Sequence, residues 1–296
     1  MIHRLYMTPN QASNSGMTSL GPGATARLRE LLAGVGRLGV AFSGGVDSSV
    51  LLALAARALG PTRVVALLGV SPSLAADERA GAHAIARDLG VRIVEVTTRE
   101  LDRTDYRANG PDRCFHCKDE LFSTIDAEIV RSERLGAIAY GENADDARRP
   151  DRPGSRAANA HRVLRPLADL GLSKADVRRI ARELGLASAD KPAAPCLASR
   201  IPHFTEVTPR KLRQIEEAEA ALRRLGFQDL RVRHHGDVAR LELPAEDLIR
   251  AVGEPLRSAV QEAVLGAGFR FVAVDLAGIQ SGAFTLPLVV GAPAGE

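Results

Sequence analysis

The chain has 296 residues, of which 45% are hydrophobic and 25% charged, and it contains no tryptophan. This composition is typical of a globular protein with an aliphatic core and excludes a fibrous or disordered chain. The net charge of +3 and the scattered arginines give little support to nucleic-acid binding. No apolar run approaches the roughly 18 residues of a membrane-spanning helix, so we expect no association with a membrane.

The first 19 residues are rich in Asn, Ser and Gly, and we predict that they form a disordered lead. They lack the apolar stretch of a secretory signal. We therefore expect a cytoplasmic protein, a compartment in which stable disulfide bonds are rare.

Short apolar runs alternate with helical patterns between residues 37 and 185. The predicted strands are 37–42, 63–70, 91–97 and 137–141, and helical patterns such as 48–60 and 75–90 lie between them. This alternation predicts an α/β domain built on a parallel sheet. In its last helix, Ser173 is the expected cap and Gly185 the expected end.

A loop between a predicted strand and helix carries the sequence SGGVDSS. Its two glycines, Gly44 and Gly45, allow a tight backbone turn whose N–H groups point into one concavity. The helix N-terminus and the hydroxyls of Ser43, Ser48 and Ser49 add further donors for phosphate oxygens. Asp47 places a carboxylate beside this cradle, which suits a bridging Mg²⁺. An ordinary glycine-rich turn is the alternative.

A second polar stretch, GENADD, follows the strand predicted over 137–141. Polar residues at the carboxyl end of a parallel strand face the crevice where such sheets bind ligands. Glu142, Asn143 and Asp145 are therefore candidate nucleotide-site residues, and a polar turn is the alternative.

The three cysteines are divided between two stretches, with Cys114 and Cys117 in DRCFHCK and Cys196 about eighty residues further on. A disulfide, a zinc site, a redox pair and an iron–sulfur site are all compatible with this spacing.

The proline-rich stretch DKPAAPCLASRIP marks a domain boundary, with an N-terminal domain over 20–195 and a smaller C-terminal α+β domain over 196–296. We expect the second domain to serve substrate binding and oligomerisation. A helix is predicted from Thr208 to Gly226. Two strand-like runs around His235-Gly236 predict a hairpin, and 269–276 has the pattern of a further strand.

The combination of a strand with SGGVDS resembles the pyrophosphate loop of the ATP pyrophosphatases, which include GMP synthetase, NAD synthetase and the tRNA thiolation enzymes. The resemblance implies a Rossmann-like domain of the adenine nucleotide alpha hydrolase type. It implies that ATP is cleaved between its α and β phosphates and that AMP is joined to a substrate oxygen. Pyrophosphate would stay in the loop of Ser43–Ser49, and the end of the second strand, at Gly69, would border the adenine.

The stretches NGPDRCFHCK, KPAAPCLASRIP, RVRHHGDVARLE, GENADD and SGAF (281–284) are similar, in this order, to the LarE-type ATP-dependent sulfur transferases. The similarity covers residues 20 to 285, with Glu142 standing where a small residue is commoner. It implies that a carboxylate of pyridinium-3,5-dicarboxylate mononucleotide is adenylated and converted to a thiocarboxylate for the nickel-pincer nucleotide cofactor, and it suggests a homo-oligomer.

Within this resemblance, the mononucleotide needs a phosphate site, for which the candidates are Arg231, Arg233, Lys118, Ser199 and Arg200. Arg231 and Arg233 alternate along one predicted strand, and Arg binds phosphate in a bidentate manner. Arginines that face solvent on a hairpin are the alternative.

The resemblance also implies a role for the cysteines. Cys196 matches the cysteine that donates its own sulfur and becomes dehydroalanine. With Cys114 and Cys117 it would instead hold a [4Fe–4S] cluster with one open iron, which carries the transferred sulfide. A Cys₃His zinc site with His116 and a redox pair are the alternatives, and the physiological sulfur donor is unknown.

Two rival functions follow from the same loop. A tRNA thiolation enzyme would need an RNA-binding surface, yet aromatic residues make up only 4% of the chain. A non-catalytic ATP-binding protein would need neither the intact loop nor the cysteines.

Overall fold

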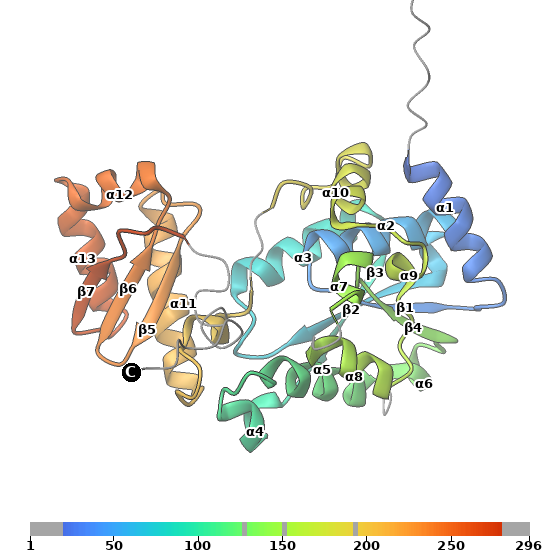
Figure 1. The fold of residues 1–296 in the computed structure, drawn as a ribbon, viewed down its shortest axis with the longest axis horizontal. Coiled ribbons are helices and arrows are strands. Elements are labelled where there is room, and N and C mark those ends of the chain that lie inside the picture. Colours follow the sequence, from blue (N-terminus) through green and yellow to red (C-terminus); the bar gives the residue numbers. More distant parts are fainter. Residues whose placement is uncertain (1–19, 126–128, 150–152, 192–194, 280–296) are drawn as a thin grey trace, which may run out of the picture.

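The computed structural model describes residues 20–125, 129–149, 153–191 and 195–279, and these form two sheets with their own helices (Figure 1). The predicted lead over 1–19 and the SGAF stretch lie outside the described residues. In the first sheet every strand pairing is parallel, which confirms the predicted α/β class. Its spatial order is β3-β2-β1-β4, with β1 Leu38–Ala41, β2 Val64–Val70, β3 Arg92–Thr97 and β4 Ala137–Tyr140.

Helices cover both faces of this sheet, which explains why its strands are nearly continuous apolar runs. In β2, Val64 and Leu68 belong to the cluster on one face, while Val65 and Leu67 belong to the cluster on the other. The first face is covered by α1 Leu20–Leu31, α2 Val46–Leu59, α3 Ala76–Asp88 and α10 Lys174–Glu183. The second face is covered by α5 Arg113–Thr124 and α8 Pro153–Ala160.

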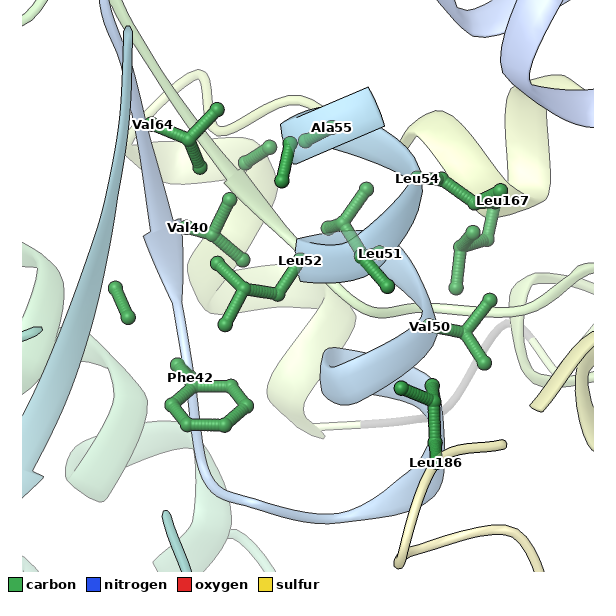
Figure 2. Close-up of a cluster of buried hydrophobic side chains, with 14 of the residues drawn as sticks. Val40, Phe42, Val50, Leu51, Leu52, Leu54, Ala55, Val64, Leu167 and Leu186 are labelled. Carbon is green, nitrogen blue, oxygen red and sulfur yellow. The ribbon is translucent and has the colours of Figure 1, made fainter. Parts of the chain in front are cut away.

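Helix α2 is buried on nearly all sides (Figure 2). Leu52 points toward Val40 and Val64 of the sheet, while Leu54 lies beside Leu167 on the opposite side. A helix that is apolar all round needs such an enclosed position. The start of α2, and the loop before it, are therefore fixed by the core.

The predicted capping of α10 is confirmed. The Ser173 hydroxyl accepts from the Asp176 N–H, and the Asp176 carboxylate accepts from the Ser173 N–H. The expected end at Gly185 agrees with its left-handed backbone, φ 64°.

The second sheet has the order β5-β6-β7, with β5 Arg231–His235, β6 Val238–Glu242 and β7 Phe271–Val274. The hairpin around Gly236 is confirmed, since β5 and β6 pair antiparallel. Strand β7 joins parallel to β6, which requires the intervening helices as a crossover. The helices of this unit are α11 Pro209–Arg224, α12 Ala245–Val252 and α13 Leu256–Gly266.

The two units meet through a small apolar cluster that includes Tyr106, Leu197, Ile201 and Ile215, with Cys117 packed against it. The short elements of the chain are α4 Thr104–Arg107, α6 Val130–Ser132, α7 Ala144–Ala147, α9 Pro166–Asp169, η1 Pro61–Arg63, η2 Glu100–Asp102 and η4 Leu197–Arg200. No helix within the described ranges has the length and apolar character needed to cross a bilayer. The division at residue 195 remains a prediction.

Gly141, directly after β4, leaves no room for a side chain. A Cβ there would lie 2.7 Å from the Ser48 nitrogen and 2.8 Å from the Asp47 carbonyl carbon. Because these are backbone atoms of a buried helix, we expect Gly141→Ala to lower the free energy of unfolding by about 1–3 kcal/mol. Urea denaturation measures the change.

The control for this substitution is Gly81→Ala in α3, where a new Cβ would meet nothing within 4 Å. This change should stabilise the protein by up to about 1 kcal/mol, because alanine favours a helix. Equal shifts in the two variants would contradict the steric account of Gly141.

Candidate active site

The loop between β1 and α2 has the geometry expected of an anion cradle. Gly44 has a φ of 71°, and a Cβ there would lie 3.3 Å from the Cα of Ala82 in α3. Gly45 is the N-cap residue of α2 and provides no side-chain cap. The N–H groups of the first turn are therefore left for a ligand, at the positive end of the helix dipole.

The serines of the loop have different positions. The hydroxyl oxygens of Ser43 and Ser48 lie 3.2 Å apart, and the Ser48 hydroxyl donates to the Gly45 carbonyl at 3.0 Å. Both serines line the cavity in front of the loop. Ser49 is fully buried, and its hydroxyl has no hydrogen-bond partner among the described residues.

Asp47 is the point where three segments of the chain meet. One of its carboxylate oxygens accepts from the Asn143 amide at 3.1 Å, and the other accepts from the Lys174 ammonium at 2.5 Å. The Asp145 carboxylate accepts from the Lys174 backbone N–H at 2.8 Å and so holds the start of α10. The turn after β4 thus brings both the Asn143 amide and the Lys174 ammonium into contact with the Asp47 carboxylate.

Glu142 occupies a different place from its two neighbours in the predicted site. It is 2% exposed, accepts a hydrogen bond from Ser155, and lies 3.5 Å from the Arg165 guanidinium. It is absent from the residues that line the two cavities in front of the loop.

A cavity of about 320 Å³, a volume at the lower end of ligand pockets, brings part of the predicted site together, but Cys114, Asn143 and Asp145 do not line it. Its walls combine the pyrophosphate loop, the ends of β2 and β3, helix α5 and the segment before η4. The lining residues include Ser43, Gly45, Asp47, Ser48, Gly69, Ser71, Glu100, Cys117, Lys118, Tyr140 and Cys196.

Lys118 projects into this cavity beside Tyr140, with its ammonium 4.5 Å from the ring centroid. Gly154 of α8 makes this possible, since a Cβ there would lie 2.6 Å from the Lys118 nitrogen. A cation–π contact of this kind holds the lysine in a defined place.

The two cysteine stretches meet at this cavity, which is lined by Cys117 and Cys196 but not by Cys114. Cys114 and Cys117 lie one turn apart on α5, while Cys196 immediately precedes η4. Burial, followed by the nearby sulfur of Cys196 and the carboxylate of Glu100, raises the pKa of Cys117 well above its ordinary value. Cys196 is exposed to solvent. Desolvation of its thiol by the neighbouring chain nevertheless raises the pKa of Cys196, and the positive charge of Arg113 opposes that rise.

Three cysteine sulfurs are soft ligands of the kind that bind iron–sulfur clusters. Within the described residues, however, no three His, Cys, Asp or Glu side chains are arranged at metal-ligand geometry. The His116 ring nitrogen Nε2 lies 3.2 Å from the Asp112 carboxylate.

Two residues of the site were not identified from the sequence. Lys174 lies 127 positions from Asp47 and begins a helix, so its only local signal is the preceding cap at Ser173. Glu100 is 1% exposed, accepts from the Ser71 hydroxyl and lines the cavity. It lies in a polar stretch that carries no motif.

A second cavity, of about 280 Å³, lies on the other side of Cys196. It shares Ser43, Asp47 and Cys196 with the first. Its other charged walls are Lys174, Arg178, Lys191, Arg200 and Arg223, together with Glu78 and Glu219. A further cavity continues from Lys191, Arg200 and Arg223 to Arg231. Basic side chains therefore extend from the loop to the hairpin of the second sheet.

The arginines proposed for the substrate phosphate are buried rather than solvent-facing. Arg233 forms two 2.8 Å contacts with the Glu242 carboxylate and also donates to the Ser199 carbonyl. Arg200 pairs with buried Glu219 at 2.9 Å. Burial, together with the neighbouring Arg233 and Arg200, lowers the pKa of Arg231.

Comparison with known proteins agrees with this geometry. A family model described as asparagine synthase matches residues 28–128, which contain the loop and the first three strands. An uncharacterised protein of Synechocystis is 39% identical over 86% of this chain and 94% of its own length. The pyridinium-3,5-bisthiocarboxylic acid mononucleotide synthase of Lactiplantibacillus plantarum is 34% identical over 83% of this chain and 88% of its own length.

The parallel sheet, its SGGVDSS loop and the asparagine synthase match define an ATP-dependent enzyme of the ATP pyrophosphatase class. Within this class, the chain belongs to the family of the LarE-type ATP-dependent sulfur transferases.

The position of Lys174 predicts a role in nucleotide binding. Its ammonium lies beside the loop, where it would approach the β and γ phosphates of ATP. We expect Lys174→Gln to weaken ATP binding by about 1–2 kcal/mol, or roughly tenfold, because the lysine is partly exposed. Calorimetric titration with ATP and Mg²⁺ measures the loss.

A matched control is Lys211→Gln, which removes a charge at a lysine bonded to the Glu206 carbonyl outside all of these cavities. ATP affinity should not change in this variant. A similar loss in both would show that Lys174 acts only through net charge.

Proposed function

We propose that the protein adenylates a carboxylate of pyridinium-3,5-dicarboxylate mononucleotide and replaces an oxygen of that carboxylate with sulfur. The product is a thiocarboxylate on the way to the nickel-pincer nucleotide cofactor. The observation that carries the proposal is that the pyrophosphate loop, Cys117 and Cys196 line one cavity. The name of the L. plantarum relative, a pyridinium-3,5-bisthiocarboxylic acid mononucleotide synthase, supports the choice of substrate.

In the first step a carboxylate oxygen attacks the α-phosphorus of ATP, and the bond to the bridging oxygen of pyrophosphate breaks. The N–H groups at the start of α2 and the hydroxyls of Ser43 and Ser48 would hold the departing pyrophosphate. Asp47 would hold Mg²⁺ between the phosphates, and Lys174 would add a second positive charge. Gly69 would border the adenine at the end of β2.

In the second step a sulfur nucleophile attacks the acyl carbon, and AMP leaves with the electron pair of the broken C–O bond. A free carboxylate resists this attack, whereas an acyl adenylate has a good leaving group. Cys196 lies where the two cavities meet, so sulfur held there would be close to both ATP and the substrate.

For the source of sulfur, we propose a [4Fe–4S] cluster held by Cys114, Cys117 and Cys196. These three residues would hold the cluster, which would supply an additional sulfide for the transfer. The alternatives are the sulfur of Cys196 itself, a zinc site that includes His116, and a redox pair.

The phosphate of the mononucleotide would lie at the basic end of the connected cavities. Arg231 lines this end together with Arg200, while Arg233 is fixed by Glu242 and holds the Ser199 carbonyl. Lys118, on the other side of Cys196, would face the activated carboxylate.

The first step can be tested by replacing the carboxylate of Asp47. We expect Asp47→Asn to slow pyrophosphate release from ATP and the mononucleotide by roughly two orders of magnitude or more, because one Mg²⁺ ligand loses its charge. The fold should remain intact by circular dichroism. Asp190→Asn, which alters an exposed carboxylate paired with Arg182, serves as the control. Wild-type rates in the Asp47 variant would mean that the loop is only structural.

The phosphate site is better tested by substituting Arg231 than by substituting Arg233, because removal of Arg233 would leave Glu242 as a buried, unpaired charge. Arg231→Ala should weaken binding of the mononucleotide by about 1.5–3 kcal/mol and change ATP affinity little. Calorimetry measures both affinities. Arg270→Ala, at an exposed arginine next to β7, should change neither. A loss confined to ATP would assign Arg231 to the nucleotide.

The source of sulfur can be tested on protein purified without oxygen. We expect bound iron and sulfide, an iron–sulfur absorption spectrum, and loss of both in Cys114→Ala. A sacrificial Cys196 would instead leave Cys114→Ala active for one turnover and make the wild-type chain about 34 Da lighter, through loss of H₂S. Finding that mass change in iron-free wild-type protein would exclude the cluster as the source.

A further inference from the structure

Arg113, the residue before Cys114, is a buried cation with unusual partners. It is 8% exposed, and its Nη1 donates to the Asn109 side-chain oxygen at 2.5 Å and to the Ala198 carbonyl at 2.8 Å. Among the described residues it forms no ion pair with a carboxylate. A buried guanidinium without a compensating anion is costly, so a structural role alone does not account for it.

Two other buried arginines are each neutralised by a carboxylate, as is usual for a buried charge. Arg200 pairs with Glu219 and Arg233 pairs with Glu242, each with a carboxylate that is itself buried. At Arg113 the groups nearby are instead the thiols of Cys196 and Cys114.

Asn109 fixes the orientation of Arg113. Its side-chain amide donates to the carbonyls of Ile201, Pro202 and Thr205 at 3.2, 2.7 and 3.1 Å, so its side-chain oxygen must face Arg113. It is fully buried and adopts a left-handed φ of 57°, which asparagine tolerates better than most residues.

These contacts connect the two cysteine stretches directly. Asn109 and Arg113 belong to the segment that leads into α5, and their acceptors Ala198 and Ile201 belong to the segment that follows Cys196. The carbonyl of Ala198 is two residues from Cys196, and Arg113 is next to Cys114. The pair therefore joins the segments beside the sulfurs rather than at a distance from them.

We propose that Asn109 and Arg113 form a clamp that positions Cys114 and Cys117 against Cys196, with the guanidinium of Arg113 facing the sulfur site. This inference rests on the proposed function, since it assigns the shared cavity to sulfur chemistry. Arg113 is a positioning residue, because it acts through the placement of the thiols.

The test is the proximity of the thiols in the full-length protein, freed of bound metal with a chelator. Dibromobimane is added until alkylation is complete, and peptide mass spectrometry measures how much Cys196 is joined to Cys114 or Cys117. This readout needs neither ATP nor the mononucleotide. A failure of the proposed reaction would appear in pyrophosphate release and leave the cross-link unchanged.

We expect the joined peptides to be the major product in the wild type and a minor product in Arg113→Lys and Arg113→Gln. Neither side chain can bridge Asn109 and the Ala198 carbonyl as the guanidinium does. Retained ATP affinity in these variants would show that the nucleotide domain is folded, and if one variant does not fold, the other carries the test.

Arg103→Lys is the matched control. Arg103 also holds α5, through Asp119 at 2.7 Å and the His116 carbonyl at 3.4 Å, and these contacts lie within α5 rather than on the Cys196 segment. Cross-linking should stay at the wild-type level in this variant. Wild-type cross-linking in the folded Arg113 variants, or its absence from the wild-type protein, would overturn the proposal.

Discussion

The burial of helix α2 against the parallel sheet fixes the geometry on which the proposed chemistry depends. Its interior residues fill the core between the sheet and helices α1 and α10, so its first turn is held at the ends of β1 and β4 (Figure 2). Gly44 and Gly141 allow the backbone to come this close. The anion cradle is thus set by packing before any nucleotide binds, which is the preorganisation that favours stabilisation of developing charge.

In the proposed reaction, the position of Cys196 matters for sulfur transfer as the position of the loop matters for adenylation. It lies between the cavity in front of the loop and the basic cavity that continues toward Arg231. In the proposed reaction, adenylation takes place on an oxygen and sulfur transfer at the carbon of the same carboxyl group, so ATP, the mononucleotide and sulfur must meet at one point. A cysteine at the junction of the two cavities satisfies that requirement, and contacts such as Arg233 with Ser199 connect its segment to the second sheet.

Local patterns in the sequence predicted the strands, the cap at Ser173, helix α11 and the hairpin at Gly236, because each depends on neighbouring residues. They did not predict that Lys174 reaches Asp47 or that Arg233 is neutralised by Glu242, since these contacts depend on how distant elements pack. Glu142 shows the same limit. Its place after β4 suggested a ligand-facing carboxylate, but Ser155 of α8 and Arg165 hold it in a buried position outside the two cavities in front of the loop.

The central claim is that ATP cleavage and sulfur transfer are coupled in one cavity. The most direct test supplies oxygen-free protein with ATP, Mg²⁺, sulfide and pyridinium-3,5-dicarboxylate mononucleotide, and analyses the small molecules by mass spectrometry. The account predicts a thiocarboxylate mononucleotide, with one AMP and one pyrophosphate formed for each sulfur incorporated. AMP formation without sulfur in the mononucleotide, or sulfur incorporated only into added tRNA, would contradict it.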